Sequence, residues 1–174
     1  MSDTSNSPGN RFLFLPADWK ALEEFIARLS AQIREQKLIS AEAVNQSSES
    51  WHDNYPFEEA QRQLKALLVQ RGEFSKMREL GEVVEPPTIV ESVTFGTTVS
   101  YRNRTDSFDD RVTIGSHHVF SEELRDDGVI SYNSPVARIL MGGREGEVAK
   151  GEINGRMVEL EIRSVVPWNE GKEP

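Results

Sequence analysis

The spacing of apolar residues changes once along this chain, and that change limits the possible folds more than any other feature. Over residues 19–33 apolar side chains recur three and four positions apart, the seam of a coiled coil rather than the broad face of a globular helix. A second helical pattern covers residues 57–77. After Pro86-Pro87, apolar and polar residues alternate as they do in strands. The sequence therefore predicts two long helices followed by a separate β-rich part.

The two helical patterns predict an antiparallel coiled-coil hairpin over residues 16–82, because a short polar connection joins them. Asp18, just after Pro16, is the predicted N-cap of the first helix, and Gly81 is the predicted stop of the second. The seam weakens after residue 33, where the next heptad positions hold small or polar residues: Gln36, Ser40, Ala43 and Ser47. Two such helices alone bury a single seam, so they predict an arm rather than a globular core.

The second half predicts a small antiparallel α+β domain over residues 91–167, preceded by a linker at 83–90. Ser134 is the predicted N-cap of one short helix, which Gly142-Gly143 ends. Asn154-Gly155 predicts a type I′ hairpin turn. The predicted strands are residues 93–99, 111–114, 129–132, 147–153 and 157–165. Residues 1–15 are expected to be a disordered or loosely packed tail, and residues 168–174 a second tail.

Composition excludes several function classes. The net charge of −9 argues against binding duplex nucleic acid by bulk electrostatics. The chain has no cysteine, so thiol catalysis, disulfides and cysteine-based zinc sites are excluded. No apolar run approaches the roughly 20 residues that span a bilayer, so a cytoplasmic protein is expected. His117 and His118 are adjacent and should point to opposite sides of a strand, which favours surface histidines over a metal pair. Without a phosphate loop or a nucleophile elbow, an autonomous enzyme is disfavoured.

One charge pattern marks the predicted connection between the helices. Residues 38–61 contain no Lys or Arg but five acids, whereas both flanks are mixed and the second helix carries Arg62 and Lys65 soon after. Glu49 and Asp53 fall in the connection. Exposed carboxylates there could ligate Mg²⁺ with few protein contacts, leaving water and phosphate oxygens to complete its shell. The alternative is a solvated acidic turn, whose carboxylates favour the N-terminus of the second helix.

A resemblance to a known family rests on two segments. Residues 130–142, ISYNSPVARILMG, resemble the signature I-S-x-x-S-P-[IV]-A-R-x-L-[IL]-G of the bacterial GreA/GreB transcript-cleavage factors. Residues 93–99, VTFGTTV, are similar to the V-x-F-G-[AST]-x-V strand of the same family. The likeness covers most of residues 91–166. In the N-terminal half it is one of architecture, a hairpin of suitable length and order.

The resemblance implies a fold and a mode of action. The C-terminal domain of the family is FKBP-like and docks on the rim of the RNA polymerase secondary channel, a role that falls here on Ser134, Pro135 and Arg138. The hairpin enters the channel, where tip acids hold a Mg²⁺ ion shared with the polymerase and backtracked RNA is cut. Arg62 and Lys65 would then lie on the shaft near the RNA. The factor has no cofactor of its own, acts as a monomer, and meets the 3′ end of the nascent RNA only in the complex.

The tip departs from the family pattern. Members carry D-x-x-E-N, whereas residues 49–54 here read ESWHDN. Asp53 takes the place of the second acid, and Ser50 stands where the first would be. Glu49 is four residues from Asp53, and because positions i and i+4 face the same side of a helix, it could substitute on a helical turn. The expected metal ligands are therefore Asp53 and Glu49.

The sequence is compatible with four functions. The first is a cleavage-stimulating elongation factor, and the second is a secondary-channel binder that alters pausing or initiation without efficient cleavage. The third, a prolyl isomerase or chaperone, would need an aromatic-lined pocket. A structural coiled-coil adaptor is the fourth, and the signature of residues 130–142 argues against it. The aromatic residues available for such a pocket are Phe95, Tyr101, Phe108, Phe120 and Tyr132.

Overall fold

A computed structural model describes residues 11–47 and 55–168, without the side chains of residues 43–47, 55 and 56. The chain divides into two compact units. One is a helical unit, residues 20–80. The other, here called the β unit, combines residues 1–19 with residues 81–174. The N-terminal segment therefore belongs with the C-terminal half of the chain.

The helical unit is the predicted antiparallel hairpin. It is formed by helices α1 (Pro16–Ser47, whose first turn belongs to the β unit) and α2 (Tyr55–Glu79). The rings of Phe25 and Phe74 meet edge to face with centroids 5.0 Å apart, so the early part of α1 lies beside the late part of α2. Four of the five predicted seam positions of α1 are confirmed, with side chains at most 8% exposed: Leu22, Ile26, Leu29 and Ile33. The fifth, Trp19, is half-buried, belongs to the β unit and packs against Phe14, with ring centroids 5.7 Å apart.

Beyond Ile33 the seam continues with hydrogen bonds instead of apolar contacts. Ser40 is 5% exposed, and its hydroxyl oxygen accepts a hydrogen bond from Nε2 of Gln61 at 2.8 Å. Gln36 donates from Nε2 to the carbonyl oxygen of Ala60 at 3.4 Å. The polar heptad positions thus hold the helices together without burying much apolar surface. Such side-chain pairs favour one register, because a shifted pairing would leave them unmatched.

The β unit contains a five-stranded sheet in the order β5-β4-β3-β7-β6. Its strands are β3 (Thr97–Asn103), β4 (Phe108–Gly115), β5 (Val129–Ser131), β6 (Val148–Ile153) and β7 (Arg156–Pro167). Asn154 and Gly155 have φ of 51° and 80° between β6 and β7, as a type I′ turn requires. The α+β class and the helices-then-sheet order are confirmed.

Two details of the sheet differ from the sequence-based expectation. β5 pairs with β4 in parallel, Thr113 opposite Val129, so the sheet is mixed rather than purely antiparallel. A short helix, α3 (Glu122–Asp126), occupies the connection that makes this parallel return possible. The strand predicted at residues 93–99 begins only at Thr97, because Gly96 has φ of 77° and Thr97 Oγ1 donates to the carbonyl oxygen of Thr94 at 2.7 Å.

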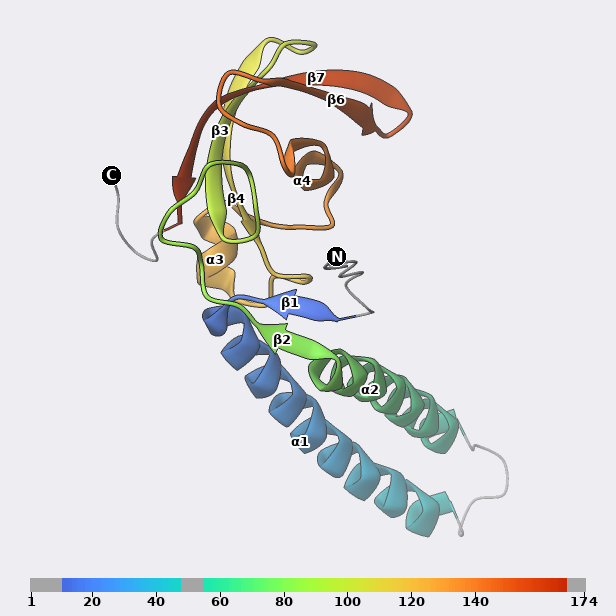
Figure 1. Ribbon diagram of the computed structural model, residues 1–174. Helices are drawn as coiled ribbons and strands as arrows, with labels where there is room; N and C mark the ends of the chain where they lie inside the picture. Colours follow the sequence, from blue (N-terminus) through green and yellow to red (C-terminus); the bar gives the residue numbers. More distant parts are fainter. Residues whose placement is uncertain (1–10, 48–54, 169–174) are drawn as a thin grey trace, which may run out of the picture. The chain divides into compact units, whose positions relative to one another are not determined.

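The short helix α4 (Pro135–Leu140) packs on the inner face of the sheet, which curls around it in Figure 1. Alternate residues of β3, β4 and β7 point to this face. Together with Ala137 and Leu140 of α4 they form the main core, whose buried members are Val93, Val99, Tyr101, Val112, Ile114, Ala137, Leu140, Val158, Leu160 and Ile162.

Residues 12–15, which were expected in the loosely packed tail, are part of the β unit. Strand β1 (Phe12–Phe14) pairs in parallel with β2 (Gly81–Val83), so Gly81 begins a strand directly after the end of α2. Leu15 is fully buried in a second small core with Leu124, Val129 and Trp168. The sequence of a four-residue apolar run cannot predict this burial, because the residues that Leu15 packs against lie more than a hundred positions away.

The predicted N-cap role of Asp18 is wrong. α1 begins at Pro16, a residue suited to a first helical position, and Asp18 already lies within the first turn. Its carboxylate is fully buried, and Oδ1 accepts hydrogen bonds from the backbone N–H groups of Phe120 and Ser121 at 2.8 and 3.0 Å. Asp18 therefore ties α1 to the segment that enters α3.

In the part of the chain that the structure describes, no helix combines the length and the apolar character needed to cross a membrane.

Candidate functional site

The turn that begins α4 is built as its sequence predicts. Ser134 has extended backbone angles, and its Oγ accepts a hydrogen bond from the backbone N–H of Ala137 at 3.2 Å. Pro135 follows in the first helical turn, where its missing N–H costs nothing. We call residues 134–138 the docking turn. Since the serine and the proline are both explained by helix capping, local structure alone accounts for this pair.

The outward side of α4 carries two of the residues that the sequence predicts for docking, Pro135 and Arg138. Ala137 and Leu140 are fully buried against the sheet, whereas Pro135, Arg138 and Met141 are exposed. These three positions are three residues apart, so they form one stripe along the helix. The Arg138 side chain thus stands one turn beyond Pro135 on the same side. An exposed proline, guanidinium and thioether together can contact a partner protein through apolar area and charge-assisted hydrogen bonds.

The packing of α4 against the sheet requires Ile139 to lie close to the backbone of β6. A Cβ atom at Gly151 on β6 would lie 2.4 Å from Cγ1 of Ile139. At its C-terminal end, Gly142 has φ of 81° and donates to the carbonyl oxygen of Val93, and the carbonyl oxygen of Gly143 accepts from the N–H of Val93, both at 2.8 Å. α4 is therefore fixed at both its inner face and its end.

The loop before α4 is held by His117, which is not the surface histidine expected. Its backbone N–H donates to the carbonyl oxygen of Leu13 at 2.8 Å, and its carbonyl oxygen accepts from Oγ of Ser131 at 2.8 Å. Its ring contacts Phe12 with centroids 4.4 Å apart. His118 is exposed and stacks obliquely on Phe120, with centroids 4.5 Å apart. The two rings thus face different surroundings, although both residues lie in a bend after β4 and not in the strand on which the expectation rested.

A hollow of about 390 Å³ lies on the inner face of the sheet, where α4 no longer covers it. Buried Tyr101 and half-exposed Phe108 line it together with Val136 and the ion pair of Asp106 with Arg156, 2.7 Å between Oδ1 and Nη1. Burial, and then the hydrogen bond to Asp110, raises the pKa of Tyr101 above its ordinary value, so the hydroxyl stays protonated.

The aromatic residues considered for a prolyl-isomerase pocket do not gather there. Only Tyr101 and Phe108 reach the hollow. Phe95 packs against Tyr132 at 6.1 Å, and Phe120 lies 6.4 Å from Phe14, centroid to centroid. An aromatic cage around a proline ring is therefore not assembled by these five side chains.

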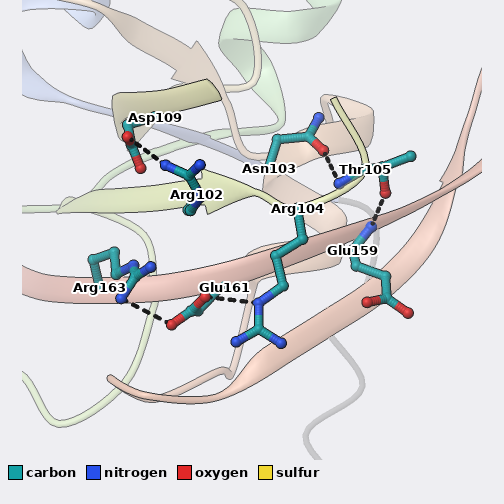
Figure 2. Close-up of polar contacts among 8 residues, drawn as sticks. All are labelled: Arg102, Asn103, Arg104, Thr105, Asp109, Glu159, Glu161 and Arg163. Carbon is teal, nitrogen blue, oxygen red and sulfur yellow. Dashed lines mark hydrogen bonds and ion pairs between the residues drawn. The ribbon is translucent and has the colours of Figure 1, made fainter. Parts of the chain in front are cut away.

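The outer face of the sheet carries charges that largely neutralise one another (Figure 2). Glu161 accepts from Nε of Arg104 at 2.7 Å and lies 3.0 Å from Nη1 of Arg163. The hydrogen bond from Arg104 is the main cause that lowers the pKa of the Glu161 carboxyl. Arg102 pairs with Asp109 at 2.9 Å. Exposed pairs of this kind add little stability. On this face of the described sheet, the named cations are therefore paired with acids.

The expected metal ligands, Glu49 and Asp53, lie outside the described residues, as does Ser50. Among the described residues no cluster of three or more His, Asp or Glu side chains could hold a metal ion. Arg62 and Lys65 are exposed on α2, and Nη1 of Arg62 lies 2.8 Å from Oε2 of Glu59. Both cations thus lie on solvent-facing positions of the helix that follows the connection.

Comparison with known proteins agrees with this architecture. Residues 87–167 match the family described as "Transcription elongation factor, GreA/GreB, C-term". The chain is 26% identical over 142 residues to "Transcription elongation factor GreA" of a Nitratiruptor species, covering 76% of this chain and 85% of the relative. A second protein of that name, from Aliarcobacter butzleri, is 26% identical over 121 residues, 65% of this chain and 69% of the relative.

Solved structures with a similar course of the chain include GreA factor homolog 1 (Gfh1) of Thermus thermophilus, at 17% identity and a TM-score of 0.41, covering 89% of this chain and 98% of that one. Another is the GreA/GreB elongation factor of Nitrosomonas europaea, at 16% identity and a TM-score of 0.35, covering 90% and 99%. Residues 87–167 thus match the C-terminal domain of the GreA/GreB elongation factors, and the chain is similar to GreA relatives over most of its length.

Proposed function

We propose that this protein binds RNA polymerase at the secondary channel and stimulates cleavage of backtracked RNA, so that arrested complexes resume elongation. The observation that supports it is the match of residues 87–167 to the C-terminal domain of the elongation factors. In this proposal the protein is an accessory factor in the cytoplasm that activates the polymerase's own cleavage reaction, and it acts as a monomer.

The docking turn is the proposed contact with polymerase. Pro135 and Arg138 are exposed on the outward side of α4, while the opposite side is anchored in the core. An outward-facing helix end with a fixed backbone suits a protein contact, because little backbone freedom remains to be lost on binding. Arg138→Glu should therefore weaken polymerase binding, about tenfold or more, while the fold survives.

Asp53 is the proposed Mg²⁺ ligand at the hairpin tip, with Glu49 assisting. Carboxylate oxygens are the ligands that Mg²⁺ prefers, and an ion shared with the polymerase would activate the water that attacks the RNA phosphate. Arg62 and Lys65 on α2 would lie near the RNA. Asp53→Ala should abolish stimulated cleavage and change polymerase affinity by no more than about twofold, as is usual for an exposed position.

Cleavage of a stalled, backtracked elongation complex, with and without the protein, tests this function. Glu49→Ala is expected to lower the rate less than Asp53→Ala, and Ser50→Asp, which restores the family spacing, to raise it. Competition for polymerase, measured on the same variants, separates a chemical defect from a binding defect. If Asp53→Ala cleaves as fast as the wild type, the tip carboxylates have no role.

A second function is favoured by one observation, Ser50 at the position of the first tip acid. With only one of the two tip acids at its family position, the protein would occupy the channel and change pausing or initiation without efficient cleavage. Binding by the wild type with no stimulated cleavage, combined with cleavage by Ser50→Asp, would establish this alternative.

A further inference from the structure

His117 lies where three segments of the β unit meet. Its backbone binds Leu13 beside β1, its carbonyl binds Ser131 at the end of β5, and it follows the end of β4 itself. Ser131 in turn accepts at Oγ from the N–H of Asn133 at 3.1 Å, and the N–H of Ser134 donates to the carbonyl oxygen of Ser131 at 2.9 Å. The imidazole thus borders the loop that leads into the docking turn.

The side chain of Asn133 contacts the imidazole ring of His117. Its Nδ2 lies 2.8 Å from Nδ1 of His117, and the Tyr132 hydroxyl lies 3.5 Å from the same nitrogen. With the amide in this orientation Nδ2 donates to Nδ1, and the proton of the neutral ring is then on Nε2. A protonated imidazole carries hydrogens on both nitrogens and could not accept this hydrogen bond.

We propose that neutral His117 is a positioning residue for the docking turn: by accepting from Asn133 it holds the residue directly before Ser134, and protonation of the ring releases that residue and weakens docking. This rests on the proposed function, in which the docking turn contacts polymerase. Asn133 directly precedes Ser134 and lies inside the turn that the Ser134 N–H closes on the carbonyl oxygen of Ser131, so release of the Asn133 side chain loosens this turn at the cap.

The surroundings of the ring favour its neutral form. Burial, and to a smaller extent the nearby His118, lowers the pKa of His117 below its ordinary value. On the β1 side the His117 ring contacts uncharged Phe12, and the neighbouring Arg11 is paired with Glu82 at 3.0 Å. On the side of the loop after β5 the ring contacts the Tyr132 hydroxyl and the Asn133 amide. The hydrogen bond is therefore intact at neutral pH and lost as pH falls through a pKa below that of a free histidine.

The first test uses the free full-length chain and nuclear magnetic resonance. Titration from pH 8 to pH 5 should show the His117 ring protonating below its ordinary pKa. The backbone amides of Ser134, Ala137 and Arg138 and the Asn133 NH₂ group should shift with the same midpoint. In Asn133→Ala the amides of the turn should no longer follow the ring. If these amides do not move with the His117 titration in the wild type, the proposal is overturned.

The second test measures polymerase binding across the same pH range with three variants. His117→Phe keeps an aromatic ring beside Phe12 but cannot accept, so it should bind about fivefold more weakly at pH 7.5, as expected for one hydrogen bond, with no further loss on acidification. His117→Gln can accept through Oε1 and should bind close to wild type without the pH dependence. His118→Phe, the matched control, should bind like the wild type at pH 7.5. Like the wild type it should weaken by about fivefold towards pH 5.5, with a midpoint moved to higher pH because the neighbouring imidazole no longer lowers the pKa of His117.

The outcomes separate the two proposals. Wild-type binding that His117→Phe leaves unchanged at every pH would overturn the positioning role and leave the proposed function standing. No binding by the wild type at pH 7.5, where the ring is neutral, would overturn the proposed function, and the docking role of His117 with it.

Discussion

Asp18 joins two segments that are 102 positions apart in sequence. Its Oδ1 accepts from the N–H groups of Phe120 and Ser121, and its side chain is fully buried. A carboxylate in this place satisfies backbone donors just ahead of α3, whose own N-cap is Ser121. Oδ2 of Asp18 is buried with no hydrogen-bond partner among the described residues, so the residue matters chiefly because its removal would leave two backbone donors unpaired.

Asp18→Ala is expected to lower the free energy of unfolding by about 2–3 kcal/mol, because two backbone donors lose a buried, charged acceptor. Chemical denaturation of the full chain, followed by the far-ultraviolet circular dichroism of the sheet, measures the change. Asp126→Ala, an exposed acid at the end of α3, should stay within about 0.5 kcal/mol of the wild type. Equal effects of the two substitutions would mean that the Asp18 contact contributes nothing.

Residues differ in how much of their role the sequence could predict. Ser134 and Pro135 act within the first turn of their own helix, so their spacing was sufficient to predict the N-cap. Asp18 and His117 act on residues reached only after the chain folds back. Asp18 resembled an N-cap and His117 a surface histidine, because their true partners, Ser121 and Asn133, are not neighbours in sequence.

At the scale of elements, α4 has six residues and cannot be stable alone, since isolated helices below about 12 residues are marginal in water. Its stability comes from contact with the sheet, where Ile139 lies directly over Gly151. The pattern of buried Ala137 and Leu140 shows which side is held. The direction of Pro135 and Arg138 is therefore set by a glycine on β6.

Gly151→Ala should displace α4 and lower the free energy of unfolding by about 1–3 kcal/mol, because the added methyl group overlaps a stiff, β-branched side chain. Thermal or chemical denaturation measures this, and polymerase binding should weaken with it. The double variant with Ile139→Ala should recover part of the binding. If Gly151→Ala changes neither the free energy of unfolding nor polymerase binding, α4 packs less tightly on the sheet than the contact implies.

Gly72→Ala is the control at the same scale, with the opposite sign expected. Gly72 lies inside α2, is exposed, and a Cβ there would meet nothing within 4 Å. The substitution should stabilise the helical unit by up to about 1 kcal/mol, as alanine exceeds glycine in helix propensity. A rise in α-helical thermal stability without a change in polymerase binding is the expected result.

At the scale of the whole molecule, the β unit is made of two pieces of chain, residues 1–19 and 81–174. Phe14 and Leu15 are fully buried, and Leu15 donates from its backbone N–H to Oγ of Ser116 at 2.9 Å. The hairpin is thus an insertion, in sequence, between two parts of one folding unit. This follows from the parallel pairing of β1 with β2, which joins a segment before the hairpin to a segment after it. A chain organised simply as arm, then linker, then domain would not have this pairing.

A chain in which residues 20–80 are replaced by a short Gly-Ser linker should fold, whereas the fragment 81–174 should be clearly less stable. The fragment loses the burial of Phe14 and Leu15, each worth about 1.5–3 kcal/mol for a large apolar side chain. Denaturant midpoints of the two proteins provide the comparison. Equal midpoints would show that residues 11–19 add nothing to the β unit.

The charge of the whole molecule leads to one more expectation. With a net charge of −9 and the outer-face cations paired with acids, free duplex DNA should bind only weakly at physiological salt. Fluorescence anisotropy with a labelled duplex should show no salt-dependent affinity in the micromolar range. Tight binding that Arg138→Glu leaves unchanged would contradict the assignment of polymerase as the partner.

Sequence by itself determined what depends on local spacing. The apolar period of residues 19–33, the Asn154-Gly155 turn and the Ser134-Pro135 cap each arise from a few neighbouring residues, so the hairpin, the β6–β7 turn and α4 were predictable. The tertiary structure decided what depends on distant partners: the parallel return of β5, the place of β1 beside β2, and the surroundings of Asp18 and His117. Contacts between segments far apart in sequence produce no periodic pattern of residues. Each partner on its own looks like an ordinary loop or tail residue, so the sequence does not reveal them.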